Sequence, residues 1–114
     1  MTKDQHLKLF DEFIVCLDEA RFYDAHETLE EIWFPRRFED SNEIKLLKGI
    51  INATVSFELY KKGRLRQSDK VWRNYLKYRQ YLYKVDSIYL NNYSFICRYI
   101  DGIKNTKTLH AIRS

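Results

Sequence analysis

The most hydrophobic part of the chain is NEIKLLKGIINATVSFELYKK, at residues 42–62. Its apolar side chains recur at helical spacing but cover more than one stripe of the expected helix. These side chains are Leu46, Leu47, Ile50, Ile51, Ala53, Val55, Phe57 and Leu59. A helix that is apolar on several sides is contacted on several sides, so this segment predicts a central helix around which the rest of the chain packs.

Amphipathic patterns on both sides of this segment predict the remaining helices. Apolar side chains return every three or four residues in four further windows. The windows lie at about residues 3–20, 24–34, 69–85 and 92–101. The connections between them are short, so consecutive helices are expected to pack antiparallel. The sequence therefore predicts an all-α fold, a single compact bundle of four to five helices.

Capping residues set the expected starts of these helices. Thr2 and Gln5 have the spacing of a capping box, in which each side chain binds the other residue's backbone N–H. Short polar side chains are preferred at the N-cap because they accept a hydrogen bond from the first turn. The other expected N-caps are Asp24, Asp40 or Ser41, and Ser68.

Length and composition allow one domain. A chain of 114 residues with 1 Pro and 3 Gly is too short for a second core and too poor in turn residues for a β-sandwich. Residues 103–114 carry no sustained pattern, so we expect a domain at residues 1–102 followed by a C-terminal tail that can be mobile. No apolar run approaches the length of a membrane span, and the N-terminus is polar. Together with the widely separated Cys16 and Cys97, these features predict a cytoplasmic protein with free thiols.

A polar stripe runs along the helix expected at residues 24–34. His26, Glu30 and Trp33 are spaced i, i+4 and i+7 and therefore share one face. A histidine and a carboxylate one turn apart can share a divalent metal ion, and the carboxylate can also orient the imidazole for acid–base work. The same pair can equally be a structural hydrogen bond between packed helices. His26 and Glu30 are thus candidate metal ligands and, with Glu27, candidate catalytic residues.

Polar residues also interrupt the central helix. Lys48 and Asn52 lie four residues apart within its apolar surface. A polar side chain among apolar neighbours costs stability unless it finds a partner. We therefore expect Lys48 to pair with a carboxylate of the preceding helix and Asn52 to pair with His26 or Glu30, which makes both residues candidates for the same site.

Three segments resemble a known family. FYDAHETLEEIW at residues 22–33 is similar to the Y-x-A-H-E-x-L-E-x-x-W signature of the domain of unknown function 309 family. LKGIINA at residues 47–53 resembles its L-x-G-L-I-Q-x-A segment, and KKGR at residues 61–64 resembles its R-R-G-N turn. The resemblance covers about residues 7–85 and implies a small, all-helical bacterial protein whose biochemical role is unassigned.

The resemblance also implies where a family site would fall. Its polar cluster maps onto His26, Glu27, Glu30, Trp33 and Asn52. Asn52 replaces the usual Gln, which shortens the reach of the amide. In addition, Leu59 stands about where many members carry a second His. If that His binds a metal in relatives, this chain lacks one of the ligands.

Charge is distributed unevenly along the chain. Residues 1–60 hold 7 Lys/Arg and 13 Asp/Glu, a net charge of −6, whereas residues 61–114 hold 13 and 3, a net charge of +10. Cations recur along one face of the helix expected at 69–85 and the turn before it, interleaved with tyrosines. The candidate anion- or partner-binding residues are Arg66, Lys70, Arg73 and Lys77. Such a stripe can bind an acidic protein, the acidic half of a second copy, or the phosphates of a nucleic acid, or it can simply face water.

Three functions follow as hypotheses. The favoured one is a non-enzymatic interaction protein that uses the basic stripe, with no cofactor. The second is a small metal-dependent or acid–base enzyme that uses the His26 and Glu30 pair. The third is nucleic-acid binding through the basic stripe, for which the sequence shows no recognised motif.

Overall fold

We analysed a computed structural model that describes the backbone of residues 1–113 and the side chains of residues 1–106. Within that part of the chain, helices account for nearly all regular structure, as predicted. They are α1 (Lys3–Asp18), α2 (Phe22–Trp33), the 3-10 helix η1 (Phe34–Arg36), α3 (Asn42–Lys61), α4 (Leu65–Arg79), the 3-10 helix η2 (Gln80–Tyr83) and α5 (Leu90–Arg113).

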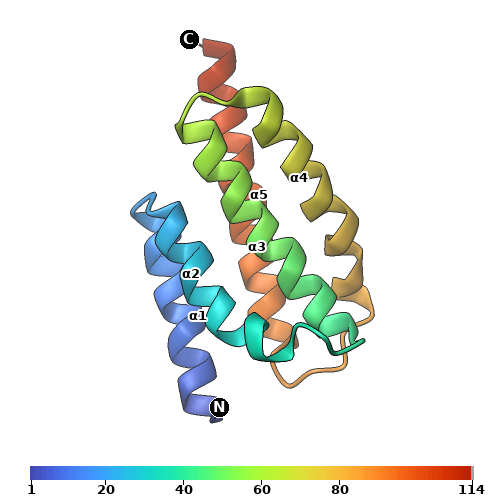
Figure 1. Cartoon of the computed structure of the whole chain (residues 1–114). Helices are drawn as coiled ribbons and strands as arrows, with labels where there is room; N and C mark the ends of the chain where they lie inside the picture. Colours follow the sequence, from blue (N-terminus) through green and yellow to red (C-terminus); the bar gives the residue numbers. More distant parts are fainter. Residues whose placement is uncertain (114) are drawn as a thin grey trace.

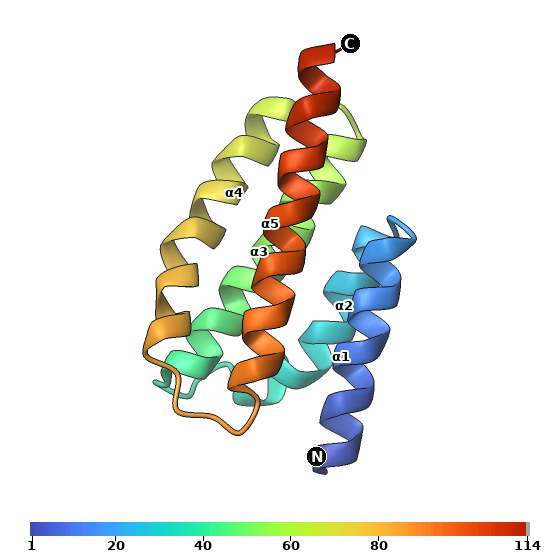
Figure 2. The ribbon, with the colours of Figure 1, turned by 180° about the vertical axis from the view of Figure 1, so that it is seen from behind.

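The helices form one antiparallel bundle with α3 at its centre. Figure 1 shows α4 on one side of α3 and the α1–α2 pair on the other, with consecutive helices running in opposite directions. Seen from behind, α5 lies across α3 between these two flanks (Figure 2). Half of the positions in α3 are buried. This burial confirms the central helix predicted from the broad apolar surface of the segment. The predicted all-α bundle is therefore correct.

Two of the predicted N-caps are confirmed and two are wrong. The Thr2 hydroxyl accepts a hydrogen bond from the Gln5 N–H at 3.2 Å, and the Gln5 side chain accepts one from the Thr2 N–H at 2.8 Å. The Ser41 hydroxyl accepts from the Ile44 N–H at 3.2 Å and begins α3. Asp24, in contrast, lies inside the first turn of α2, which begins at Phe22.

Ser68 serves the crossing of two helices instead of capping α4. The helix begins earlier, at Leu65, and Ser68 is buried against Ser56 of α3. Each hydroxyl donates to the backbone carbonyl of the other serine at 2.7 Å. Small residues that exchange such bonds let two helices approach closely. Because the Ser68 hydroxyl is engaged by Ser56, it does not cap the start of α4.

The last helix is longer than predicted. α5 continues through Gly102 to Arg113, whereas the sequence pattern placed its end near residue 101. Tyr75 and Arg79 of α4 bind Asp101 of α5. The Tyr75 hydroxyl donates to the Asp101 carboxylate at 3.0 Å, and the Arg79 guanidinium pairs with the same carboxylate at 2.8 Å. Most of the predicted tail at residues 103–114 lies outside the side chains that the structure describes.

The core is built from aromatic rings between the helices. Phe57 of α3 contacts Phe22 of α2 and Trp72 of α4, with ring centroids 5.3 and 5.8 Å apart. Cys16 and Cys97 are buried and free, as predicted, and burial raises the pKa of the Cys97 thiol to about 11. Across the described residues, no helix is long and apolar enough to span a membrane.

Candidate functional site

The predicted His26 and Glu30 pair forms on α2. Nε2 of His26 lies 2.7 Å from Oε1 of Glu30, in a half-buried hydrogen bond. His26 borders a hollow of about 200 Å³ between α2 and the C-terminal half of α3, which we call the histidine hollow. The hollow is lined by Phe22, Tyr23, His26, Thr54, Val55, Glu58, Leu59 and Lys62.

The other candidates do not converge on this pair. The Asn52 amide donates to the carbonyl of Lys48 at 2.8 Å, so the predicted pairing with His26 or Glu30 is wrong. Lys48 makes no ion pair with an α2 carboxylate among the described residues, and its ammonium lies 5.4 Å from the ring of Tyr78 instead. Glu27 is exposed on the outer side of α2, where its hydrogen bond raises the pKa of Tyr23. The candidate catalytic residues thus occupy separate places.

Metal ligands are sparse around His26. Leu59, the position at which the family resemblance implies a second His, lines the same hollow as His26. An imidazole at position 59 would therefore line the same hollow as His26, and this chain has an isobutyl group there. Over the side chains of residues 1–106, no group of three or more His, Cys, Asp or Glu is arranged to hold a metal ion.

A second hollow gathers cations and aromatic rings at the opposite end of α3. It has a volume of about 370 Å³ and is lined by the end of α2, the loop after η1, the first turns of α3, the end of α4 and η2. We call it the lysine–tyrosine hollow. Its lining residues are Trp33, Arg37, Glu39, Ile44, Lys45, Lys48, Lys77, Tyr78 and Tyr81. Four of the nine are cations and three are aromatic, a composition that suits an anionic ligand with a planar part.

Two stacked tyrosines hold the lysines around this hollow. The rings of Tyr78 and Tyr81 lie 6.2 Å apart at 27°. The ammonium groups of Lys48 and Lys77 lie 5.4 and 5.5 Å from the Tyr78 ring, and that of Lys45 lies 5.3 Å from the Tyr81 ring. Cations are attracted to the negative face of an aromatic ring, so the tyrosines keep the positive charges close together despite their repulsion.

The positive charge of the hollow is only partly compensated. Glu39, the one carboxylate in its lining, is paired with Arg36 at 2.7 Å. Lys45 is paired with Asp40 at 3.1 Å. Lys48 and Lys77 have no carboxylate partner within the described chain. An anion entering the hollow would therefore meet cations that are not already neutralised.

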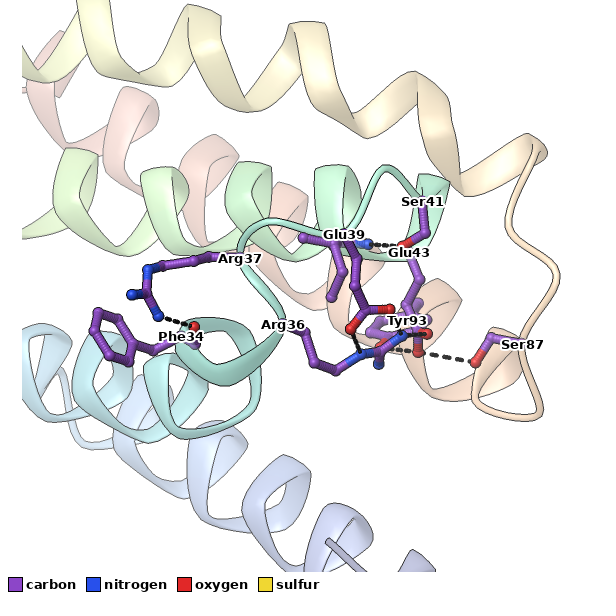
Figure 3. Close-up of polar contacts among 9 residues, drawn as sticks. Phe34, Arg36, Arg37, Glu39, Ser41, Glu43, Ser87 and Tyr93 are labelled. Atoms are coloured by element: carbon purple, nitrogen blue, oxygen red, sulfur yellow. Dashed lines mark hydrogen bonds and ion pairs between the residues drawn. The ribbon is translucent and has the colours of Figure 1, made fainter.

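The partly buried carboxylate of Glu43 joins the elements next to the hollow. Glu43, in the first turn of α3, accepts hydrogen bonds from Tyr93 at 2.6 Å and Ser87 at 3.0 Å and pairs with Arg36 at 3.0 Å (Figure 3). Burial alone would raise the pKa of Glu43, but these three donors together hold it below its ordinary value. The contacts tie η1 to α3 and α5 and so position the neighbouring Arg37, which donates to the Phe34 carbonyl at 2.6 Å.

His6 lies beside this network without a hydrogen-bond partner. Only 7% of its surface is exposed, its ring stacks on Tyr89 at 4.1 Å, and its buried Nε2 has no partner. Burial lowers the pKa of His6; Arg36 and the N-terminal ammonium lower it further, and Glu43 opposes them. The neutral imidazole is therefore the form that the fold accommodates.

We expect His6→Phe to stabilise the protein by about 1 kcal/mol, because it removes an unsatisfied buried polar atom and retains the ring stacking. A lowered pKa means that the wild type loses stability as the pH falls below the unfolded-state value of about 6.5. The gain should therefore be larger at pH 5 than at pH 8. Urea unfolding at both pH values measures it, and a gain of equal size at both would contradict the assignment.

The predicted anion-binding residues lie on the exposed face of α4. Arg66, Lys70, Arg73 and Lys77 follow one another at helical spacing, and all four are exposed; we call them the α4 stripe. Arg73 is partly neutralised by Asp69 at 2.6 Å. Lys77 belongs to both the stripe and the lysine–tyrosine hollow, so the two basic features are continuous.

The described residues thus form an all-α bundle with a histidine–glutamate pair on α2 and a hollow lined by lysines and tyrosines beside α3 and α4. Residues 10–71, more than half of the chain, match the family described as "Domain of unknown function (DUF309)". The chain belongs to this family, and the three segments that carry the resemblance all lie within the matched residues. No curated protein and no solved structure matches the chain.

Proposed function

We propose that this protein is a non-enzymatic binding protein that captures an anionic partner on the α4 stripe and the lysine–tyrosine hollow. The observation that carries the proposal is the set of four cations around one hollow of about 370 Å³ whose single carboxylate is already paired with Arg36. An acidic protein, a second copy of the chain and a nucleic acid would all supply the required negative charge.

The position of the candidate catalytic residues favours binding over catalysis. His26 and Glu30 form a hydrogen bond with each other across one turn of α2. Lys48 belongs to the other hollow, and the Asn52 amide is engaged by its own helix. An acid–base mechanism needs its groups within reach of a shared reacting atom, and this arrangement separates them. The two buried free thiols suit a reducing compartment, which supports a cytoplasmic setting.

Titration with inorganic polyphosphate tests the proposal, because this probe supplies charge without a base or a peptide. We expect the wild type to bind it in a salt-dependent manner by calorimetry. Lys48→Gln combined with Lys77→Gln should raise the Kd about tenfold, since it removes two lining cations that have no carboxylate partner among the described residues. Both lysines are exposed, so the double variant should unfold at nearly the same temperature as the wild type.

Lys3→Gln combined with Lys8→Gln is the matched control. It removes the same charge from exposed positions on α1 and should change the Kd less than twofold. The proposal is overturned if the wild type does not bind polyphosphate at low salt, or if the control weakens binding as much as the hollow variant does.

A further inference from the structure

Resting on the proposed function, we infer that the anionic partner is a single-stranded nucleic acid. Its phosphates follow the α4 stripe, and one unpaired base enters the lysine–tyrosine hollow. The inference goes beyond general anion binding because it assigns different parts of one ligand to two adjoining features of the surface.

The first step is the linear arrangement of the stripe. Arg66, Lys70, Arg73 and Lys77 are spaced i, i+4, i+7 and i+11, so they form a row along one face of α4. At 1.5 Å per residue the row extends about 16 Å. A single small anion would meet only one or two of these cations. A chain of repeating phosphates meets them in succession, as in proteins that track a nucleic-acid backbone.

The second step is the aromatic lining at the end of the row. Lys77 closes the stripe and borders the hollow, in which Trp33, Tyr78 and Tyr81 are half-buried. Aromatic faces add nothing to the binding of a carboxylate, but they stack on nucleic-acid bases of any sequence. Beyond the hollow, Phe38 exposes 87% of its surface under the guanidinium of Arg37, whose carbon lies 4.5 Å from the ring centroid. Arg37 therefore connects an exposed ring to the lining of the hollow.

The third step is the shape of the site, which favours a single strand over a duplex. The hollow is bounded by side chains of α3, α4 and η2, of the end of α2 and of the loop that follows η1. A base that is paired and stacked in a duplex cannot enter such a space unless it is extruded, which costs several kcal/mol. An unpaired base avoids this cost.

An acidic face of a second copy is the strongest competing partner. The helix α2 presents Asp24, Glu27 and Glu31 on its exposed side, and these could meet the α4 stripe. Such a contact would use the charges alone and leave the hollow without an occupant. The two partners are therefore distinguished by whether the aromatic side chains take part in binding.

The binding experiment uses a fluorescein-labelled single strand of about 12 nucleotides, a length within the usual site sizes. Anisotropy is measured at ~150 mM salt with the full chain. We expect the single strand to bind at least tenfold more tightly than a duplex of the same sequence or poly-glutamate of similar charge. We also expect an unlabelled strand to quench the fluorescence of Trp33, whereas polyphosphate should not. The second tryptophan, Trp72, lies in the core.

Two kinds of variant separate the roles of rings and charges. Trp33→Leu and, independently, Tyr81→Leu should each weaken oligonucleotide binding about tenfold, because stacking on the base is lost. Trp33→Leu should leave polyphosphate binding within twofold of the wild type, whereas Tyr81→Leu, which also removes the ring beside Lys45, should weaken polyphosphate binding less than it weakens oligonucleotide binding. Lys70→Gln combined with Lys77→Gln should weaken the binding of both ligands. It should also reduce the magnitude of the slope of log K against log salt by about 0.7 per lysine. The α1 control, Lys3→Gln combined with Lys8→Gln, should leave the Kd for both ligands unchanged.

The outcomes distinguish this inference from the proposed function. If polyphosphate binds but the single strand binds no better than the duplex or poly-glutamate, the inference is wrong and the proposed function stands. The α4 stripe would instead bind a second copy of the chain if the protein self-associates with rising concentration, if salt dissociates the assembly, and if the oligonucleotide does not quench Trp33. If polyphosphate and the oligonucleotide both fail to bind, the inference and the proposed function fall together.

Discussion

Glu43→Ala is expected to reduce the free energy of unfolding by about 2–3 kcal/mol, because it removes the charged acceptor of a partly buried hydrogen-bond network. The Glu43 side chain is only 11% exposed. Its carboxylate is the shared acceptor for Arg36, Ser87 and the buried Tyr93. The substitution leaves the phenol hydroxyl of Tyr93 without an acceptor, whereas Arg36 loses one carboxylate but keeps its exposed pair with Glu39.

Chemical denaturation of the wild type and two variants measures this effect. Glu39→Ala is the matched control, because Glu39 pairs with the same arginine at 2.7 Å but is 47% exposed. It should cost less than about 1 kcal/mol, as exposed ion pairs usually do. Equal losses for the two alanine variants would show that burial of Glu43 does not determine its contribution.

The same carboxylate should make stability depend on pH. The folded-state pKa of Glu43 lies below its ordinary value, so the folded state favours the ionised form. The stabilisation is complete well above the unfolded-state pKa of about 4.3 and is lost as the pH falls through the lower folded-state pKa. In Glu43→Gln this part of the acid sensitivity should disappear, which unfolding measured between pH 6 and pH 3 would show.

The sequence predicts the helices better than it predicts their ends. Residues 42–62 identify the central helix because a helix with apolar residues on several sides needs neighbours on several sides to bury them. Ser41 and Ser68 look alike in sequence, yet only Ser41 caps a helix. The difference is tertiary: Ser68 lies opposite Ser56, twelve residues away, and exchanges hydrogen bonds with it. Local capping preferences do not contain that contact.

The two hollows likewise show which parts of a candidate site a sequence can predict. His26 and Glu30 are one turn apart, so their hydrogen bond follows from helix geometry alone. Asn52 has the same spacing from Lys48 and binds the carbonyl of its own helix, an alternative open to short polar side chains. The lysine–tyrosine hollow combines Arg37 of the loop after η1, Lys45 of α3 and Tyr78 of α4, and the periodicity of one helix cannot reveal such a combination. The signal available in sequence was the interleaving of tyrosines with lysines after residue 69.

The close crossing of α3 and α4 leads to the second large expected effect. Gly49 is buried in α3, and a methyl group added to it would lie 2.5 Å from the Cβ of Tyr78 and 3.5 Å from its Cα. These atoms belong to the helix backbone or are attached directly to it, so the contact can be relieved only if α4 moves. Gly49 therefore sets the distance between the two helices that carry the lysine–tyrosine hollow.

Gly49→Ala is expected to destabilise the protein by about 1–3 kcal/mol even though alanine is the better helix former. The gain in helix propensity is about 1 kcal/mol, whereas overpacking that forces a backbone shift costs more. Gly102→Ala is the matched control, since a methyl group there meets nothing within 4 Å in α5, and it should stabilise by up to about 1 kcal/mol. Because Tyr78 lines the hollow, Gly49→Ala should also weaken polyphosphate binding at temperatures where the variant is folded. Thermal unfolding and calorimetry of both variants test these opposite signs, and stabilisation by Gly49→Ala would mean that the helices do not cross as closely as described.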